Sequence, residues 1–296
     1  RNIMKKLILK SIVIVFVLMA FSSCSKDDNE ITLPIYEPTV YAVGHEEQSS
    51  SFSEAVYWEN GIKTVLPNNG SGSEASDVFV VGSDVYIAGY TNSLSQIKIA
   101  TIWKNGVSTL LGNGQSNSVG QSIFVDGNDV YVVGYKYNLV SGQNNPILWK
   151  NGIETNLLTS GYEFGRAKSV FVKNNNVYIA GHQYNSTTGK FAATLWLNNS
   201  PSFLSNASED ALANDVFIDG SDVFVLGISD GLVKYWRNGT STVISSTVYQ
   251  DEGTSILVKD SDIYITGYRD NIATYWKNGN LMQFSMPANS YSIFNT

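Results

Sequence analysis

The chain of 296 residues is dominated by an internal repeat, in which each of three short patterns occurs six times. The first pattern contains the tryptophans of the sequence, spaced 40 to 47 residues apart: Trp58, Trp103, Trp149, Trp196, Trp236 and Trp276. The second pattern runs from Val or Ile and an aromatic residue to a glycine: Gly44, Gly89, Gly134, Gly181, Gly227 and Gly267. The third is an apolar segment that begins at residues 77, 122, 169, 215, 255 and 292. Self-similarity with this period is typical of folds built from repeated supersecondary units.

Each unit of the repeat predicts four short strands. In the second copy these strands cover residues 77–81, 84–90, 100–104 and 107–111. An Asn-Gly dipeptide joins the third strand to the fourth in five copies, and Asn198-Asn199 takes its place in the remaining one. Asn and Gly adopt the positive φ angles that a two-residue hairpin turn requires, so the third and fourth strands are expected to form a hairpin.

Six such units predict an all-β fold, namely a six-bladed β-propeller of four-stranded antiparallel blades. A linear array would expose an apolar sheet face at each end, whereas a ring leaves none. The first copy begins with a second strand at residues 40–44, and the sequence finishes with a first strand at residues 290–296. We therefore expect residues 39–296 to form one propeller, closed by pairing of the strand 290–296 with the strand 40–44.

The repeat resembles the HAF-type extracellular repeats and related propellers of bacterial lipoproteins. The likeness is carried by ATIWKNGVSTLL at residues 100–111 and SIFVDG at residues 122–127, and it extends over nearly all of residues 40–296. The resemblance implies a propeller displayed outside a bacterial cell. It implies no particular chemistry, because no common activity belongs to these repeats.

The N-terminal residues have the order of an export signal. Lys5 and Lys6 come first, and an apolar stretch of about ten residues precedes Cys24. This order predicts a signal peptide over residues 1–23, whose apolar stretch is too short to span a membrane as a helix. The position of Cys24 resembles that of the lipidated cysteine in bacterial lipoproteins. The alternative is an ordinary cleaved signal followed by a cysteine that carries no lipid.

The residues after Cys24 favour the lipoprotein interpretation. Ser25-Lys26-Asp27-Asp28 resembles the export tag of surface lipoproteins in the Bacteroidetes group, although a solvated acidic tether would look the same. We therefore expect a lipidated Cys24, a flexible polar tether over residues 24–38, and a lipid-anchored protein on the surface of a bacterial outer membrane.

Composition and charge exclude several classes of protein. Charged residues make up 15% of the chain and hydrophobic residues 43%, which argues against a disordered chain. The net charge of −7 becomes −11 without residues 1–23, and an acidic surface repels nucleic acid. A single cysteine excludes a disulfide framework. The sequence carries no phosphate, dinucleotide or zinc-binding motif, so no cofactor and no metal is expected, and we expect a monomer.

A specific site is expected on one face of the propeller. The loops from second to third strands and the loops between successive units share this face, called the loop face below, and they are predicted to be long and varied. Residues that differ at two repeat positions near the channel mouth, and aromatic residues of the loops, are the candidates for binding: His45, Asp77, Tyr90, Tyr135, Tyr162, His182, Asp215, Tyr249 and Tyr268. The alternative is that the aromatic residues pack between blades and that the Asp residues bond the backbone.

These observations favour a binding or scaffold module, anchored to the cell envelope, that recognises a glycan or a protein partner through its loop face. Carboxylates beside aromatic rings also suit a carbohydrate-active hydrolase or lyase, although nothing in the sequence selects a pair of catalytic acids. A purely structural envelope protein is the third possibility. No catalytic residue is therefore assigned from the sequence.

Overall fold

The computed structural model describes residues 8–14, 38–49, 52–68, 71–245, 251–270 and 272–283. These residues form strands, turns and irregular segments, and none of them is helical. The strands make six sheets of four antiparallel strands, each in chain order, which confirms the predicted units. No helix able to cross a lipid bilayer occurs within the described ranges.

The strands of the first two sheets are β1 (Ile8–Ile14), β2 (Val40–Ser49), β3 (Phe52–Glu59), β4 (Ile62–Val65), β5 (Ser73–Val81), β6 (Asp84–Asn92), β7 (Lys98–Lys104) and β8 (Val107–Leu110). Those of the third and fourth sheets are β9 (Ser118–Asp126), β10 (Asp129–Asn138), β11 (Gln143–Lys150), β12 (Ile153–Asn156), β13 (Phe164–Lys173), β14 (Asn176–Asn185), β15 (Lys190–Leu197) and β16 (Ser200–Phe203). Those of the last two are β17 (Ala211–Asp219), β18 (Asp222–Ser229), β19 (Leu232–Arg237), β20 (Thr240–Val243), β21 (Asp251–Lys259), β22 (Asp262–Arg269), β23 (Ile272–Lys277) and β24 (Asn280–Gln283).

The turns between third and fourth strands have the geometry that their Asn residues predict. Asn105 and Gly106 have φ angles of 49° and 79°, and Asn198 and Asn199 have 50° and 69°. Positive φ at both central residues suits the tight turn whose twist matches antiparallel strands. The Asn side chain adds a second link, because Oδ1 of Asn105 accepts a hydrogen bond from the backbone N–H of Val85 at 2.9 Å.

The core lies between neighbouring sheets and is built around the repeated tryptophans. Trp103, on the third strand of its sheet, is fully buried and packs on Val43 and Ala55 of the preceding sheet. Its Nε1 donates a hydrogen bond to the carbonyl oxygen of Pro67 at 2.9 Å. Four more tryptophans are at most 1% exposed, namely Trp149, Trp196, Trp236 and Trp276. Five of the six tryptophans thus pack between sheets.

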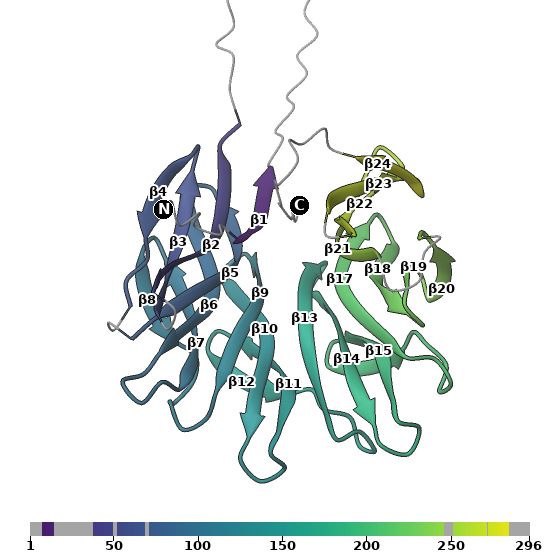
Figure 1. The fold of residues 1–296 in the computed structure, drawn as a ribbon, viewed down its shortest axis with the longest axis horizontal. Coiled ribbons are helices and arrows are strands. Elements are labelled where there is room, and N and C mark those ends of the chain that lie inside the picture. The colour runs from purple at the N-terminus through teal and green to yellow at the C-terminus, as the bar shows by residue number, and fades with distance from the viewer. Residues whose placement is uncertain are drawn as a thin grey trace, which may run out of the picture.

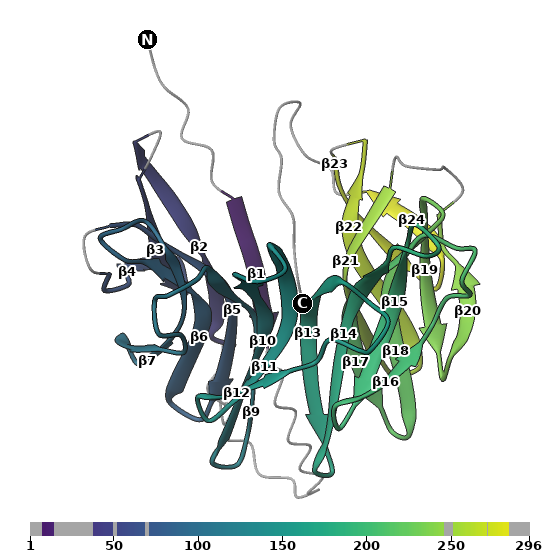
Figure 2. The same ribbon diagram turned by 90° about the horizontal axis from the view of Figure 1, so that it is seen from below.

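The six sheets follow one another around a common axis, as Figures 1 and 2 show from two directions. Their innermost strands contact one another in the order β5, β9, β13, β17 and β21. This arrangement is a propeller-like all-β fold. The described residues do not show a closed ring between the sheet β21–β24 and the sheet β1–β4. Trp58 of the first sheet is accordingly only half-buried, because no sheet of the described residues covers it.

The innermost strand of the first sheet differs from the prediction. Residues 290–296, which the sequence predicts to pair with residues 40–44, lie outside the described residues. The structure instead pairs β1 with β2, from Ile8 opposite His45 to Ile14 opposite Val40. The free edge of β2 offers unpaired backbone groups, and the β-branched residues of β1 favour an extended strand. A segment of the predicted signal peptide 1–23 therefore fills this edge in the full chain.

The loops from second to third strands are shorter than predicted, because the strands continue into them. β10 and β11 leave only residues 139–142 between them, and β18 and β19 leave residues 230–231. The longer connections are those between sheets, such as residues 111–117. The loop face therefore consists of hairpin tips and of these inter-sheet loops.

Candidate functional site

The inner strands β5, β9, β13, β17 and β21 each contain a one-residue bulge near their start. In β5 the pairing skips Ser76, just after Ala75 lies opposite Gly89. A Cβ on Gly89 would overlap the carbonyl oxygen of Glu74, so only glycine allows this approach. The repeated glycine of the second strand thus permits a bulge that turns one extra side chain toward the axis. The bulged residues are Ser76, Gln121, Lys168, Asn214 and Thr254.

The five bulged residues line the mouth of a central channel with a volume of about 590 Å³. The mouth lies where the inner strands begin, which is the loop face. A second layer below it consists of Asp77, Ser122, Ser169, Asp215 and Ser255. Phenylalanine rings line the channel beyond this layer. The centroids of neighbouring rings are 4.5, 5.0 and 5.4 Å apart along the series Phe79, Phe124, Phe171 and Phe217.

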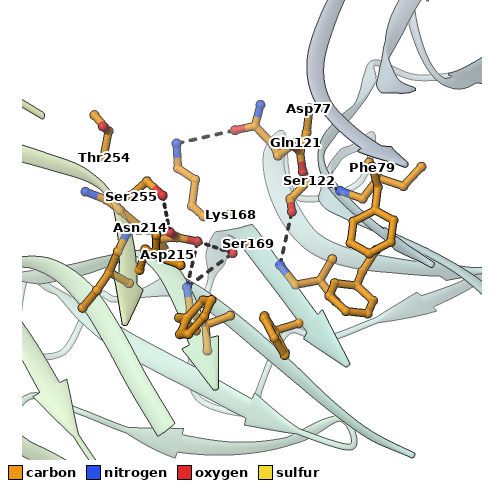
Figure 3. Close-up of a pocket in the computed structure, with 18 of the residues that line it drawn as sticks. Asp77, Phe79, Gln121, Ser122, Lys168, Ser169, Asn214, Asp215, Thr254 and Ser255 are labelled. Carbon is orange, nitrogen blue, oxygen red and sulfur yellow. Dashed lines mark hydrogen bonds between the residues drawn. The ribbon is translucent and has the colours of Figure 1, made fainter. Parts of the chain in front are cut away.

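Asp215 joins its own sheet to both neighbouring sheets (Figure 3). Its Oδ1 accepts a hydrogen bond from Ser169 Oγ at 2.6 Å, and its Oδ2 accepts one from Ser255 Oγ at 2.8 Å. Oδ2 also accepts from the backbone N–H of Ile256 at 2.8 Å. Burial raises the pKa of Asp215, while these hydrogen bonds act in the opposite direction. The carboxyl is thereby saturated with donors.

Asp77 makes the same kind of link between the second and third sheets. Its Oδ2 accepts a hydrogen bond from the backbone N–H of Ile123 at 2.9 Å, and its Oδ1 accepts from that of Val78 at 2.8 Å. Burial raises the pKa of Asp77 to about 6, and the charge of Asp215 acts weakly in the same direction. The residue keeps some exposed surface on the channel side, so water in the channel can still reach it.

Serine takes the place of Asp in the other sheets. Ser122 Oγ accepts a hydrogen bond from the backbone N–H of Val170 at 3.3 Å, and Ser169 Oγ accepts one from that of Val216 at the same distance. A side-chain oxygen of four of the five second-layer residues thus bonds the inner strand of the next sheet, and Ser255 bonds Asp215 of the preceding sheet. This recurrence gives the second layer a structural role, in which side chains hold neighbouring sheets together.

The mouth has a different character, because its residues do not recur. Lys168 Nζ lies 3.5 Å from Oε1 of Gln121, and both line the cavity (Figure 3). Asn214 Nδ2 donates to the carbonyl oxygen of Gly253 at 2.9 Å, and Thr254 Oγ1 donates to that of Thr266 at 3.1 Å. One repeat position therefore presents an ammonium group, two amides and, with Ser76, two hydroxyls around a single opening. Such a set can exchange hydrogen bonds with a small polar ligand.

Of the residues predicted from the sequence, the structure brings Asp77 and Asp215 together in the channel. The residues after the repeated glycine lie on the second strand, one strand further from the axis. There Tyr135 packs under Arg166, whose Cζ is 4.4 Å from the ring centroid, and Nδ1 of His45 is 3.9 Å from Glu74. Tyr90 is buried, and burial together with the hydrogen bond that its hydroxyl donates to Glu74 raises the pKa of that hydroxyl. Tyr268 is half-buried at the same repeat position.

His182 is 8% exposed and lies at this position in the fourth sheet. Burial lowers its pKa to about 3, with smaller contributions from the positive charges of Lys168 and Arg166. Its ring meets Phe191 edge-on at a centroid distance of 5.2 Å. The imidazole is thus neutral at physiological pH and packed within the fold.

Tyr162, one of the two predicted loop aromatics, does not line the channel. Tyr162 stacks on Phe203 of the outermost strand β16 at a centroid distance of 5.0 Å. Tyr249 and Cys24 lie outside the described residues. Within the described ranges, no three His, Cys, Asp or Glu side chains group in a way that could hold a metal ion.

The bulged residues are not among the predicted site residues, although the repeat contains the signal. Each stands between a small residue and the Ser or Asp that opens the third pattern, as Gln121 stands between Gly120 and Ser122. Polar residues that vary at one position of an otherwise regular repeat indicate side chains that packing between sheets does not constrain. Recognising this required the knowledge that the strand bulges there.

Comparisons with known proteins support the fold alone. No protein-family model matches the chain, and no curated protein matches its sequence. A chain of the nidogen/laminin complex is similar in structure, with a TM-score of 0.51 and 10% identity over 86% of this chain and 97% of that one.

Two peptidases are similar over a part of their length. A puromycin-hydrolysing peptidase of Mycobacterium tuberculosis has a TM-score of 0.56 and 11% identity over 87% of this chain and 47% of its own. A prolyl endopeptidase has a TM-score of 0.52 and 11% identity over 84% of this chain and 41% of its own. This chain thus spans less than half of either peptidase. These neighbours contain propellers, and together with the sheet arrangement they define the class: a propeller-like all-β module.

Proposed function

We propose that the chain is a binding module of a bacterial cell envelope that holds a glycan at the channel mouth on its loop face. The observation that carries this proposal is the set of bulged residues, which are all polar and all different although they occupy one position of a regular repeat. Packing alone would favour the same residue in every sheet, as it does for tryptophan.

The chemistry of the mouth suits a sugar. Hydroxyl groups both donate and accept hydrogen bonds, and the mouth offers donors on Lys168, Asn214 and Gln121 and acceptors on the amides and hydroxyls. The channel volume of about 590 Å³ lies within the range of small-ligand sites. An opening on the loop face admits the end of a longer chain.

The proposed site is complete in a closed ring, which the sequence predicts. Opposite the second strand of the first sheet, Ser290 would meet Gly44 as Ala75 meets Gly89 in the second sheet. Tyr291 would then be a sixth bulged residue, which would add an aromatic ring to the mouth. Ser292 would be the residue of the first sheet that corresponds to Asp77 in the second. Removal of residues 1–23 would release β1 from the same edge and leave it for residues 290–296.

The proposed location follows from Cys24. Lipid on this cysteine would anchor the module to the outer membrane, with residues 24–38 as the tether and the loop face free to meet extracellular glycans. Mass spectrometry of the protein purified from cell envelopes tests this point. A mature N-terminus at Cys24 with a mass increase from acyl chains is expected, and an unmodified N-terminus elsewhere would contradict it.

Glycan binding is tested with the purified protein on a glycan array, followed by calorimetry with the best ligand. Lys168→Met should weaken binding about tenfold or more, because hydrogen bonds to a charged group contribute about 1.5–3 kcal/mol. Lys173→Met, at the opposite end of β13, is the matched control and should bind like the wild type. Equal affinities for both variants, or no glycan bound by the wild type, would refute the channel as a glycan site and leave a protein partner or a structural role.

A carbohydrate-active hydrolase or lyase is the second candidate, because Asp77 and Asp215 both line the channel and both have raised pKa values. The hydrogen bonds that both carboxyls accept from the backbone of their own and the neighbouring inner strands favour the structural role described above. Sugar release from bound polysaccharide decides between them. Turnover that is lost in Asp77→Ser and Asp215→Ser would establish the enzyme, and binding without turnover would establish the binding module.

A further inference from the structure

A second hollow, called the outer groove below, lies on the loop face between the second and third sheets. It has a volume of about 370 Å³ and is formed by the loop between β8 and β9 and by β10, β11 and β12. Amide side chains are concentrated in it, namely Asn113, Gln115, Asn138, Asn145 and Asn156. The central channel and the outer groove share no lining residue.

Asn145 is the residue of the outer groove that packing does not explain. It is 7% exposed, and its Oδ1 is buried without a hydrogen-bond partner. An unpaired buried acceptor is costly, so such a group indicates a missing donor. Asn145 lies four residues before the tryptophan of its sheet. The equivalent position in four other sheets is occupied by an apolar residue: Ile99, Ala192, Leu232 and Ile272. An apolar residue is therefore compatible with the fold at this place.

The charge of the outer groove is balanced. Lys136 Nζ donates to both carboxylate oxygens of Glu154 at 2.9 Å, and these are the only charged side chains among the residues that line the groove. An ion pair of this kind presents no net charge to a ligand. An acidic or basic ligand would therefore gain no net electrostatic attraction from the groove, and a neutral ligand loses no such attraction.

The apolar part of the outer groove lies at its rim. Tyr137 is 36% exposed and Leu139 is 68% exposed, and both line the groove. An exposed aromatic ring beside amide groups suits a sugar ring, whose C–H face packs on the aromatic ring while its hydroxyls bond the amides. A hydroxyl can both donate and accept, so it can satisfy either end of the Asn145 amide.

We infer that the outer groove is a binding site for a neutral saccharide, in which Asn145 accepts a hydrogen bond from a sugar hydroxyl and Tyr137 packs on the ring. The inference rests on the proposed function, because it assigns the same face to the same class of ligand. It deepens that function: two separate sites on one face fit an extended neutral polysaccharide rather than a single sugar.

Saturation-transfer NMR with the purified full chain tests the inference. The probes are cellotetraose, xylotetraose, maltotetraose and mannotetraose, together with a neutral capped tetrapeptide, acetyl-Ala-Ser-Gly-Ala-amide. At least one tetrasaccharide should receive saturation from the wild type. The transfer to the probe should fall at least fivefold in Asn145→Leu, which copies the residue of the fifth sheet. Asn144→Leu is the matched control, because its side chain does not line the groove, and it should retain the signal.

Three outcomes would overturn the inference: no tetrasaccharide signal, a signal equal in Asn145→Leu and wild type, or an Asn145-dependent signal from the peptide alone. A melting curve shows that the variant folds, and Asn145→Leu should melt at or above the wild-type temperature because it removes the unpaired acceptor. The channel is judged separately. Lys168→Met should leave the Asn145-dependent signal intact, and the variant that keeps wild-type binding identifies the site that fails.

Discussion

Replacement of Asp77 by serine tests how the second layer holds the sheets together. Serine occupies the equivalent place in three other sheets, at Ser122, Ser169 and Ser255, so the scaffold accepts it. The substitution keeps an acceptor for the neighbouring backbone and removes the buried carboxyl. Any change in stability that depends on pH then reports the ionisation of Asp77.

The magnitude follows from the raised pKa. Asp77 has a pKa of about 6 in the folded protein, whereas an unfolded Asp has about 3.9. Between these values the folded state binds more protons, so the free energy of unfolding falls as the pH rises. The free energy of unfolding is lower by about 3 kcal/mol once the pH is above ~6. This value is an upper limit, because water in the channel reduces the effect of burial on Asp77. Below pH ~4 both states are protonated, and the penalty vanishes.

Urea denaturation followed by tryptophan fluorescence between pH 4 and pH 7 measures the effect. The free energy of unfolding of Asp77→Ser, minus that of the wild type, should increase with pH by up to about 3 kcal/mol. Asp84→Ser is the control with the opposite sign, because hydrogen bonds from Lys104 and Asn105 lower the pKa of Asp84. Parallel pH profiles for wild type and Asp77→Ser would show that Asp77 titrates normally and would refute the reasoning.

Three further predictions concern other parts of the fold. Gly134→Ala should lower the free energy of unfolding by about 2–3 kcal/mol, since its Cβ would overlap the Val119 carbonyl oxygen. Gly127→Ala, in an open turn with φ of 59°, should lose about 1 kcal/mol, and equal losses by denaturation would contradict the close approach. Deletion of residues 290–296 should lower the melting temperature, and an unchanged melting curve would argue against their pairing with residues 40–44. Cys24→Ser should abolish labelling by tritiated palmitate in cells, and a labelled variant would exclude Cys24 as the lipid site.

The regular parts of the fold were predictable because local chemistry dictates them. Asn105-Gly106 forms a tight turn since both residues accept positive φ, and Trp103 is buried since a large ring between sheets removes much apolar area from water. These rules act within about ten residues or repeat in every sheet. The sequence therefore predicts the number of sheets, their strand order and the positions of their turns.

The candidate site was predicted only in part, because it depends on geometry that one strand imposes on another. Asp77 and Asp215 were found from their position in the repeat. The bulge at Lys168 arises from contact with Gly181 on the next strand, so the pattern within the inner strand indicates a bulge only once this pairing is known. The unpaired Oδ1 of Asn145 likewise becomes visible only when its surroundings are known.

The partner of β2 was the least predictable element. Ile8–Ile14 and residues 290–296 both carry β-branched and apolar residues, so both can complete an exposed strand edge. Strand propensity does not distinguish them. The distinction depends on whether residues 1–23 are removed, which is a matter of processing rather than folding.

Acrylamide quenching of Trp58 in the mature protein tests ring closure most directly. Five tryptophans are at most 1% exposed, whereas Trp58 is half-buried because no described sheet covers it. In a closed ring Trp58 would pack on Thr266 and Ala273 of the sixth sheet, as Trp103 packs on Val43 and Ala55. The account predicts that wild type and Trp58→Phe show the same low quenching. An additional quenchable component in the wild type, about one sixth of the emission and absent from Trp58→Phe, would show an open arc and contradict it.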